Sequence, residues 1–182
     1  GNPFIARELV QVLARHGAVV LRDAAWQLLV ERVPTALSAG DLDGTVRCLL
    51  ATLPEDTQRV LAMAVVVGNE FWAGTLRDLG APNVDAGLEQ LVQAGLIVRR
   101  AASRYRGDRE YRLTSALRRR VAYDLLPPDE RRALHARVAN WIARQGRTDL
   151  EDGQRLAWHL HKGGQPEQAA ILLARQIGRA HV

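Results

Sequence analysis

The densest charge in the chain lies between Arg99 and Arg120, where nine arginines stand against only two acids, Asp108 and Glu110. Guanidinium groups bind phosphate and carboxylate through paired hydrogen bonds, so this segment indicates contact with an anionic partner. Three partners remain open: a bound nucleotide, an acidic face of the same protein, or nucleic acid. A solvated arginine-rich loop is the alternative that needs no partner. The candidate contact residues are Arg104, Arg106, Arg109, Arg118 and Arg120.

Motifs for catalysis are missing from the sequence. The single lysine, Lys162, follows His161, so no phosphate-binding loop ending in Gly-Lys-Ser/Thr exists, and there is no Gly-x-Ser-x-Gly or His-Glu-x-x-His pattern. His159 and His161 are two residues apart, which places them on different faces of a helix. The aspartates and glutamates are expected at helix caps and on exposed faces. We therefore predict no catalytic residues, no metal and no cofactor bound by this chain alone.

Composition predicts a globular protein. Hydrophobic residues make up 47% of 182 residues, and no apolar run or leader-like series predicts a membrane span or a signal peptide. The only cysteine, Cys48, is expected to be a buried structural thiol. We expect a cytoplasmic location and no membrane partner. The net charge of +5 is almost wholly arginine, which also indicates a GC-rich genome.

The first part of the chain predicts a helix, a hairpin and a linker. Apolar residues at helical spacing after Pro3 predict a helix over 3–16, ended by Gly17. Two apolar runs, 19–21 and 26–28, flank a short polar turn and predict a β-hairpin. Residues 34–44 read as a linker.

The middle of the chain predicts a winged-helix domain over 45–127. Helices are expected over about 55–67, 72–79 and 83–94, the last capped by Asn83, followed by strands over 96–98 and 111–113 around an arginine-rich tip. Three helices followed by a β-hairpin is the order of that fold. Its third helix displays Asp85, Glu89, Gln90 and Gln93 but no arginine, so we do not expect it to read DNA.

Helices are predicted again over 116–125 and after the Pro127-Pro128 break. A helical hairpin turning at 163–166 has apolar stripes that one hairpin cannot bury, so we expect residues 128–176 to be the start of a repeat region.

Residues 177–182 lack helical periodicity and are expected to be a non-native tail, since their codons can spell a sequencing adapter. The predicted fold class is mainly α: a helical remnant with a small hairpin (1–44), the winged helix, and a first TPR-like hairpin.

Motifs spread along the chain in a fixed order resemble the STAND class of signalling ATPases, most closely the predicted ATPase modules of bacterial adenylate cyclases, serine/threonine kinases and LuxR-like regulators. The matching segments are Gly1-Asn2-Pro3-Phe4 with Glu8-Leu9-Val10, Leu53-Pro54-Glu55, Val66-Val67-Gly68-x-x-Phe71, Leu91-Val92-x-x-Gly95-Leu96, and Val121-Ala122-Tyr123 before Leu134-His135. The resemblance covers residues 1–176. It implies that this chain is the end of a helical lid, a winged helix and the first repeats, cut from a protein with an upstream NTPase core.

The resemblance implies three nucleotide contacts. Pro3 matches a lid proline that packs on adenine. Ser115 stands where the family has a histidine that approaches the β-phosphate of ADP, and Arg120 replaces the acid of that motif. A serine hydroxyl can hydrogen-bond a phosphate but has no cationic form, so this contact should be weaker, and Arg119 is a candidate to substitute for it.

The function implied is a switch in which ADP favours a closed form and ATP an open, self-associating one. The chain would do no chemistry but would couple the nucleotide state of the core to the sensor repeats and an effector. Its partners would be its own NTPase core and downstream repeats, with ATP or ADP bound only in the intact parent. Two alternatives are a DNA-binding winged-helix regulator and a protein-interaction scaffold without nucleotide binding.

Overall fold

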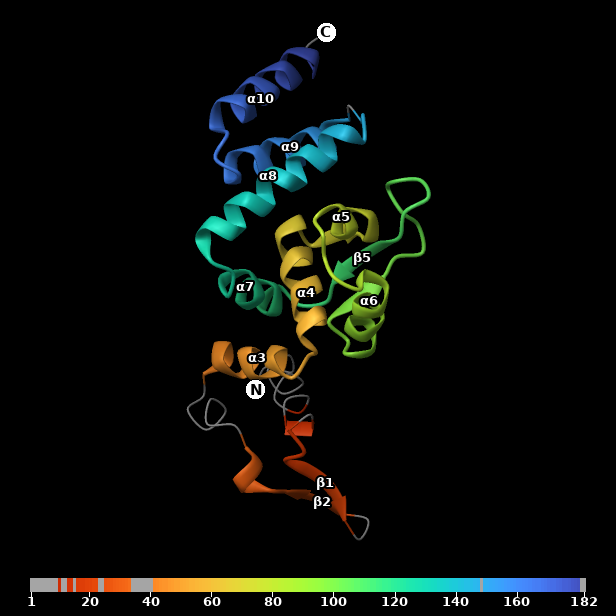
Figure 1. Ribbon diagram of the computed structural model, residues 1–182, viewed down its shortest axis with the longest axis vertical. Helices are drawn as coiled ribbons and strands as arrows, with labels where there is room; N and C mark the ends of the chain where they lie inside the picture. The colour runs from red at the N-terminus through yellow and green to blue at the C-terminus, as the bar shows by residue number, and fades with distance from the viewer. Residues whose placement is uncertain are drawn as a thin grey trace.

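The structure is a computed structural model of the 182-residue chain, and it is mainly helical. It describes residues 10, 13–14, 16–22, 25–33, 41–147 and 149–180, except the side chains of 177–180. Figure 1 shows an elongated arrangement, with a small hairpin at one end and a pair of helices at the other. A central body of helices and a three-stranded sheet lies between them. The mainly α fold class predicted from the sequence is confirmed.

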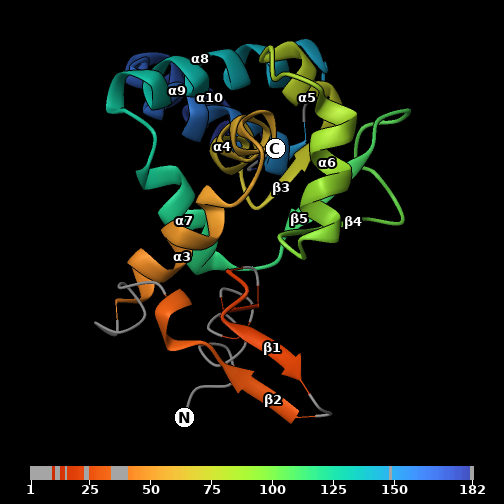
Figure 2. The same cartoon turned by 60° about the horizontal axis from the view of Figure 1, so that its bottom comes forward.

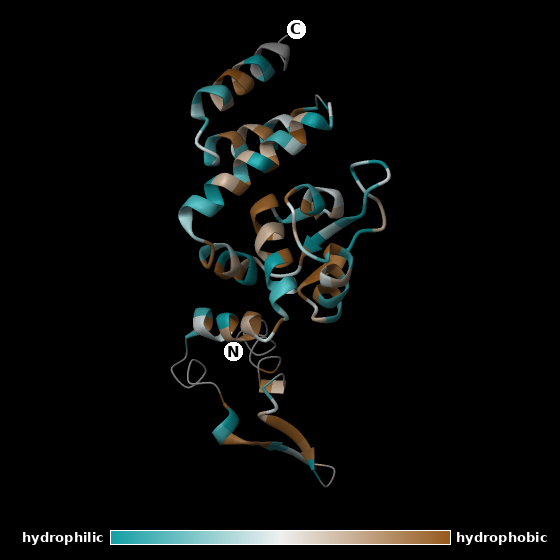
Figure 3. Cartoon of the chain, viewed as in Figure 1, coloured by the Kyte–Doolittle hydropathy of each residue, from teal (hydrophilic) through white to brown (hydrophobic). Residues whose placement is uncertain are grey.

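The hairpin near the N-terminus pairs β1 (Val19–Arg22) with β2 (Ala25–Leu28) as antiparallel strands, as predicted. A short 3-10 helix, η1 (Val30–Arg32), follows. Figure 3 shows that β1 is apolar, and Trp26 on β2 is 73% exposed. Most of the helix predicted over 3–16, Pro3 included, lies outside the described residues.

One helix begins inside the segment predicted as a linker, so the linker does not extend to residue 44. α3 (Leu42–Ala51) follows the N-cap Asp41 and buries Val46, Leu49 and Leu50 along one face. This spacing of three and four residues is the pattern of an amphipathic helix. The preceding residues, 34–40, lie outside the described part of the chain. Cys48 is only partly buried against the core, less than expected.

Three helices form the body that was predicted over 55–94. α4 (Glu55–Val67) is buried along most of its length, and α5 (Ala73–Asp78) and α6 (Val84–Gln93) pack beside it. In Figure 2, α4 lies in the centre, surrounded by the other helices. α6 approaches α4 closely at Gly87, where an added Cβ would lie 2.8 Å from a methyl of Val60.

The sheet has three strands, not the two that were predicted. β3 (Glu70–Trp72), β4 (Ile97–Arg99) and β5 (Glu110–Leu113) are antiparallel in the order β3-β5-β4. Sequence reasoning placed Trp72 at the start of a helix, but Phe71 and Trp72 are fully buried strand residues, and α5 begins at Ala73. A three-residue strand is too short to show the alternation of apolar and polar residues, so the sequence does not indicate β3.

Four helices complete the chain. α7 (Ala116–Asp124) follows the sheet, α8 (Pro128–Arg144) follows the proline break, and α9 (Leu150–Lys162) and α10 (Pro166–Ala180) form the predicted helical hairpin. The α10 backbone is helical through Ala180, although the sequence shows no helical periodicity from residue 177 onward. α8 and α9 pack closely, since an added Cβ at Gly163 would lie 2.9 Å from the backbone nitrogen of Ala136.

One hydrophobic cluster joins α3, α4, the sheet, α7 and α8, so the central body and the helix that follows it share a core. None of the helices in the described residues has both the length and the apolar character needed to span a bilayer.

Candidate functional site

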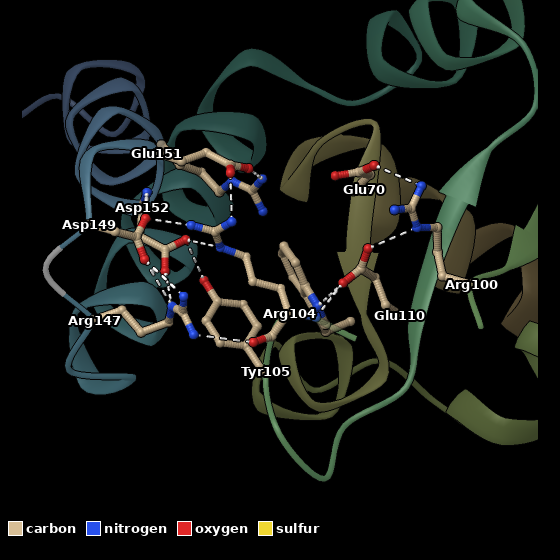
Figure 4. Close-up of polar contacts among 11 residues, drawn as sticks. Glu70, Arg100, Arg104, Tyr105, Glu110, Arg147, Asp149, Glu151 and Asp152 are labelled. Carbon is tan, nitrogen blue, oxygen red and sulfur yellow. Dashed lines mark hydrogen bonds and ion pairs between the residues drawn. The ribbon is translucent and has the colours of Figure 1, made fainter. Parts of the chain in front are cut away.

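The loop between β4 and β5 reaches across to the start of α9 through Arg104. Its guanidinium group pairs with three carboxylates: Asp149, Glu151 at 2.6 Å and Asp152 at 2.9 Å. Figure 4 shows Arg104 from the loop pointing into this acidic group. We call these four residues the loop–α9 contact. An arginine predicted to meet an anionic partner therefore meets an acidic face of its own chain.

The acidic group stands where the sequence builds a helix start. Asp149 is the N-cap of α9 and accepts a hydrogen bond from the backbone N–H of Asp152 at 3.0 Å. This bond, with the nearby Arg147 and Arg104, lowers the pKa of Asp149. Acids in the first turn also face the positive end of the helix dipole. Burial lowers the pKa of Arg104, but its hydrogen bond to Asp152 and the surrounding carboxylates outweigh that effect and raise it.

Tyr105 lies beneath the ion pairs and joins them to the core. Its hydroxyl donates to Oδ1 of Asp152 at 3.0 Å, and its ring packs edge-on against both Trp72 and Trp141. Burial, together with the charge of Asp152, raises the pKa of the Tyr105 hydroxyl. Arg147 binds Asp152 from the other side, with its Nε 2.9 Å from Oδ2. Asp152, 1% exposed, thus has partners on the β4–β5 loop and in the α8–α9 turn.

A second buried carboxylate, Glu110 on β5, fixes the base of the same loop. Its Oε2 accepts from the indole Nε1 of Trp72 at 3.0 Å and from the backbone N–H of Arg104 at 2.7 Å. Its Oε1 lies 3.3 Å from Nε of Arg100. The expectation that all acids lie in caps or on exposed faces was wrong for Glu110 and for Asp152, which are 4% and 1% exposed.

A chain of buried hydrogen bonds links α7, α8, α9 and the end of α4. The Tyr123 hydroxyl lies 2.9 Å from His135 Nε2, His135 Nδ1 lies 2.9 Å from His159 Nδ1, and His159 Nε2 lies 3.1 Å from the Val67 carbonyl oxygen. A carbonyl only accepts, so His159 donates from Nε2 and accepts at Nδ1. His135 then donates from Nδ1 and accepts the tyrosine proton at Nε2. We call this set the histidine relay.

The relay is satisfied when both imidazoles are neutral. Burial, followed by the charges of Lys162, Arg119 and Arg131, lowers the pKa of His135 to about 4. Burial and the neighbouring His135 lower the pKa of His159 to about 3. A second proton on His159, at Nδ1, would set its N–H against that of His135 Nδ1. Both histidines are therefore neutral at physiological pH.

The remaining arginine candidates divide into three kinds. Arg109 pairs with Asp85 on α6, and Arg120 pairs with Asp43 on α3 at 2.6 Å. Arg118 is buried, and its Nη1 donates to the Gly95 carbonyl oxygen at 3.3 Å. Arg106 is exposed and makes no ion pair with any residue that the structure describes. The structure therefore does not bring the five anionic-partner candidates to one place.

Of the three nucleotide-contact candidates, Pro3 lies outside the described residues. Ser115 is the N-cap of α7 and is 6% exposed, and its Oγ accepts from the backbone N–H of Arg118 at 3.2 Å. Arg119 lies on the wall of a cavity between α7 and α9. Ser115 and Arg119 thus lie four residues apart at the start of one helix.

Sequence reasoning missed the partners that make these contacts. In the sequence, His135 stands out only as part of a motif, and His159 only through its spacing from His161. His159 is buried and His161 is exposed, which agrees with their expected placement on different faces. Among the residues that the structure describes, no three metal-binding side chains gather. The Asp-x-x-Asp spacing of Asp149 and Asp152 was the one local signal, since it is a helix-cap pattern.

Comparison with protein-family models gave no match, and neither curated protein sequences nor solved structures gave one.

Proposed function

We propose that this chain is a non-catalytic regulatory segment of a STAND-class signalling ATPase, which transmits the nucleotide state of an NTPase core to sensor repeats. In that reading, α4, α5 and α6 with the three-stranded sheet are a winged-helix domain, whose wing is the β4–β5 loop. The pair α9 and α10, packed on α8, would be the start of a TPR-like repeat region. The order of helices and strands along the chain supports this assignment.

The observation that carries the proposal is the loop–α9 contact. A segment that passes a signal needs a physical connection between the part that senses nucleotide and the part that senses a partner. Arg104 supplies one, because it joins the proposed wing to three carboxylates on the first proposed repeat helix. Its partners lie 45 to 48 residues further along the chain.

The histidine relay is a second observation that supports the same proposal. Tyr123, His135 and Val67 belong to the segments that carry the resemblance to the family, and all three lie in one hydrogen-bonded chain. They come from α7, α8 and the end of α4. Motif residues that are distant in sequence thus meet at the boundary between the proposed winged helix and the proposed repeats.

The β1–β2 hairpin supports a docking role for the first part of the chain. Its large apolar residues Leu21, Trp26 and Leu28 are 58%, 73% and 54% exposed. Exposed apolar groups gathered on one small element are typical of an interaction surface. In the proposed parent protein, this hairpin would lie against the NTPase core, with ATP or ADP bound there near Pro3 and Ser115.

The DNA-binding alternative receives less support from the charges. Phosphate contacts require free basic side chains. Arg104 and Arg109 are both engaged by carboxylates of the same chain, and Asp85 stands on α6, the helix that would enter the major groove. The scaffold alternative differs from our proposal only in whether nucleotide binds the parent protein.

The proposal is tested in the longer protein that contains this segment and the sequence preceding it. We expect ADP to bind, and Arg104→Gln to change its dissociation rate by roughly 5-fold or more, since allosteric coupling is typically worth about 1–3 kcal/mol. Arg132→Gln on α8 is the matched control, because Arg132 is exposed and has no ion pair among the described residues. Absence of nucleotide binding would favour the scaffold, and an unchanged rate in Arg104→Gln would refute the coupling.

A further inference from the structure

A cavity of about 640 Å³ opens between the α4–β3 turn, α7 and α9. Its charged and polar lining residues are Asn69, Glu70, Arg119, Arg155 and His159, and the ring of Trp158 forms an apolar wall. A cavity of this size is in the range that small ligands occupy. The histidine relay closes one side, since His159 belongs to both.

Arg119 brings an unbalanced positive charge to this cavity. It makes no ion pair or side-chain hydrogen bond with the described residues, and its Nε is buried without a partner. Burial lowers its pKa, which means that the charged form loses hydration there. Buried polar groups in native proteins are almost always hydrogen-bonded, and an unpartnered one indicates a missing water or ion.

Arg155 contributes a second open donor. Its Nη2 binds Glu151 at 3.0 Å, and its guanidinium group lies over the ring of Trp72 at 4.8 Å, which fixes the side chain. Its Nη1 is nevertheless buried without a partner. The one carboxylate on the cavity wall, Glu70, is paired with Arg100 at 3.4 Å. The side chains of Arg119 and Arg155 therefore line one cavity, each with one buried nitrogen that lacks a hydrogen-bond partner, and no described carboxylate of that wall neutralises Arg119.

We propose that this cavity binds a phosphate-type oxyanion, free or as the phosphoryl group of a small molecule, through the guanidinium groups of Arg119 and Arg155. Planar guanidinium groups match the geometry of phosphate oxygens and remain charged at any relevant pH. The ring of Trp158, 39% exposed, offers a surface on which a planar group attached to the phosphate could stack. The site is built from residues of this chain alone and needs no upstream core.

The test uses the 182-residue chain and two probes, inorganic phosphate and ADP, titrated by calorimetry at constant ionic strength set with chloride. We expect saturable binding of at least one probe, and at least about tenfold weaker binding by Arg119→Gln. Tighter binding of ADP than of phosphate would identify a phosphorylated small molecule as the ligand, and equal binding would identify the free anion. Arg132→Gln, which removes an exposed arginine from α8, should bind as the unmodified chain does.

Thermal unfolding gives a second readout, because phosphate should raise the melting temperature of some variants and not of others. Without phosphate, Arg119→Gln should be at least as stable as the unmodified chain, because it removes an unpartnered, partly buried charge. With phosphate, only the unmodified chain and Arg132→Gln should gain in melting temperature. The inference is overturned if neither probe binds, or if Arg119→Gln and Arg132→Gln respond to phosphate alike. If Arg119→Gln fails to fold, the same comparison is made with Arg119→Lys, which keeps the charge and should retain part of the affinity.

Discussion

His135 and His159 face each other through their Nδ1 atoms, 2.9 Å apart, in the buried seam between α8 and α9. Only one of the two nitrogens can carry the shared proton. Because the Val67 carbonyl oxygen accepts the N–H of His159 Nε2, a neutral His159 accepts at Nδ1 from His135, and a neutral His135 accepts at Nε2 from the Tyr123 hydroxyl. Two neutral imidazoles therefore satisfy every hydrogen bond of the relay.

Acid should destabilise the chain through this pair. The pKa values of about 4 for His135 and about 3 for His159 lie below the ordinary 6.5, so on acidification the unfolded chain binds protons first. The free energy of unfolding should then fall as the pH drops from about 6.5 towards 4, by roughly 1.4 kcal/mol per pH unit for each histidine. Urea unfolding measured across this range gives the slope.

His135→Gln separates this effect from that of the carboxylates, which titrate in both proteins. A glutamine can donate to His159 and accept from Tyr123, but it cannot bind a proton, so the slope should fall by roughly 1.4 kcal/mol per pH unit, the share of one histidine. His161→Gln is the control, since His161 is exposed, and it should leave the slope unchanged. Equal slopes for the unmodified chain and His135→Gln would contradict the neutral relay.

Tyr123→Phe should destabilise the chain by about 1 kcal/mol, because His135 Nε2 would lose its only donor and remain a buried, unsatisfied acceptor. Tyr111→Phe is the matched control. Tyr111 is buried on β5, but its hydroxyl makes no hydrogen bond with the described residues, so this change should cost less. Chemical denaturation of both variants makes the comparison, and equal losses would show that the Tyr123 hydroxyl contributes nothing.

Helices with a long periodic pattern were predicted well from the sequence. α4, α6 and α8 each bury residues spaced three and four apart, and their bounds lie where the cap and proline signals place them. Asn83 stands at the N-cap position of α6, but its side chain makes no cap hydrogen bond and donates to Asp56. The elements that were missed are short or lie next to linker-like sequence. β3 has three residues, and α3 follows a stretch rich in small residues, so in both cases tertiary packing decides the structure.

The chemistry of the site could be predicted, but its partners could not. The sequence indicates Arg104 because arginine pairs with anions, and the family resemblance indicates Arg119 as a nucleotide contact. It could not find Asp152, 48 residues from Arg104, or pair His135 with His159, 24 residues away. Such pairings depend on how α8 and α9 turn back over the sheet, and no local spacing in the sequence encodes that.

Arg104→Gln should cost about 2 kcal/mol of unfolding free energy, since the change leaves the buried Asp152 with fewer partners while Asp149 and Glu151 stay solvated. Arg106→Gln, two residues away on the same loop, should change stability by less than about 0.5 kcal/mol, because Arg106 is exposed. Denaturant unfolding of the two variants decides this, and a loss as large in Arg106→Gln would mean that the loop charge alone is responsible.

Amide hydrogen exchange should locate the same effect. In Arg104→Gln, we expect faster exchange in the first turn of α9, around Asp152, with little change in α6. Faster exchange restricted to the β4–β5 loop would show that the loop is held by Glu110 and that α9 does not depend on it.

The most direct test of the coupling between the β4–β5 loop and α9 is a double-mutant cycle with Arg104→Gln and Asp152→Asn, measured by denaturant unfolding. The cycle isolates the energy shared by the two side chains from their contacts with Tyr105, Arg147 and Glu110. We predict a coupling energy of about 0.5–3 kcal/mol, the range found for contacting residues that share a network. A coupling energy indistinguishable from zero would contradict the account, because the proposed wing and the first proposed repeat helix would then be neighbours that exchange no free energy.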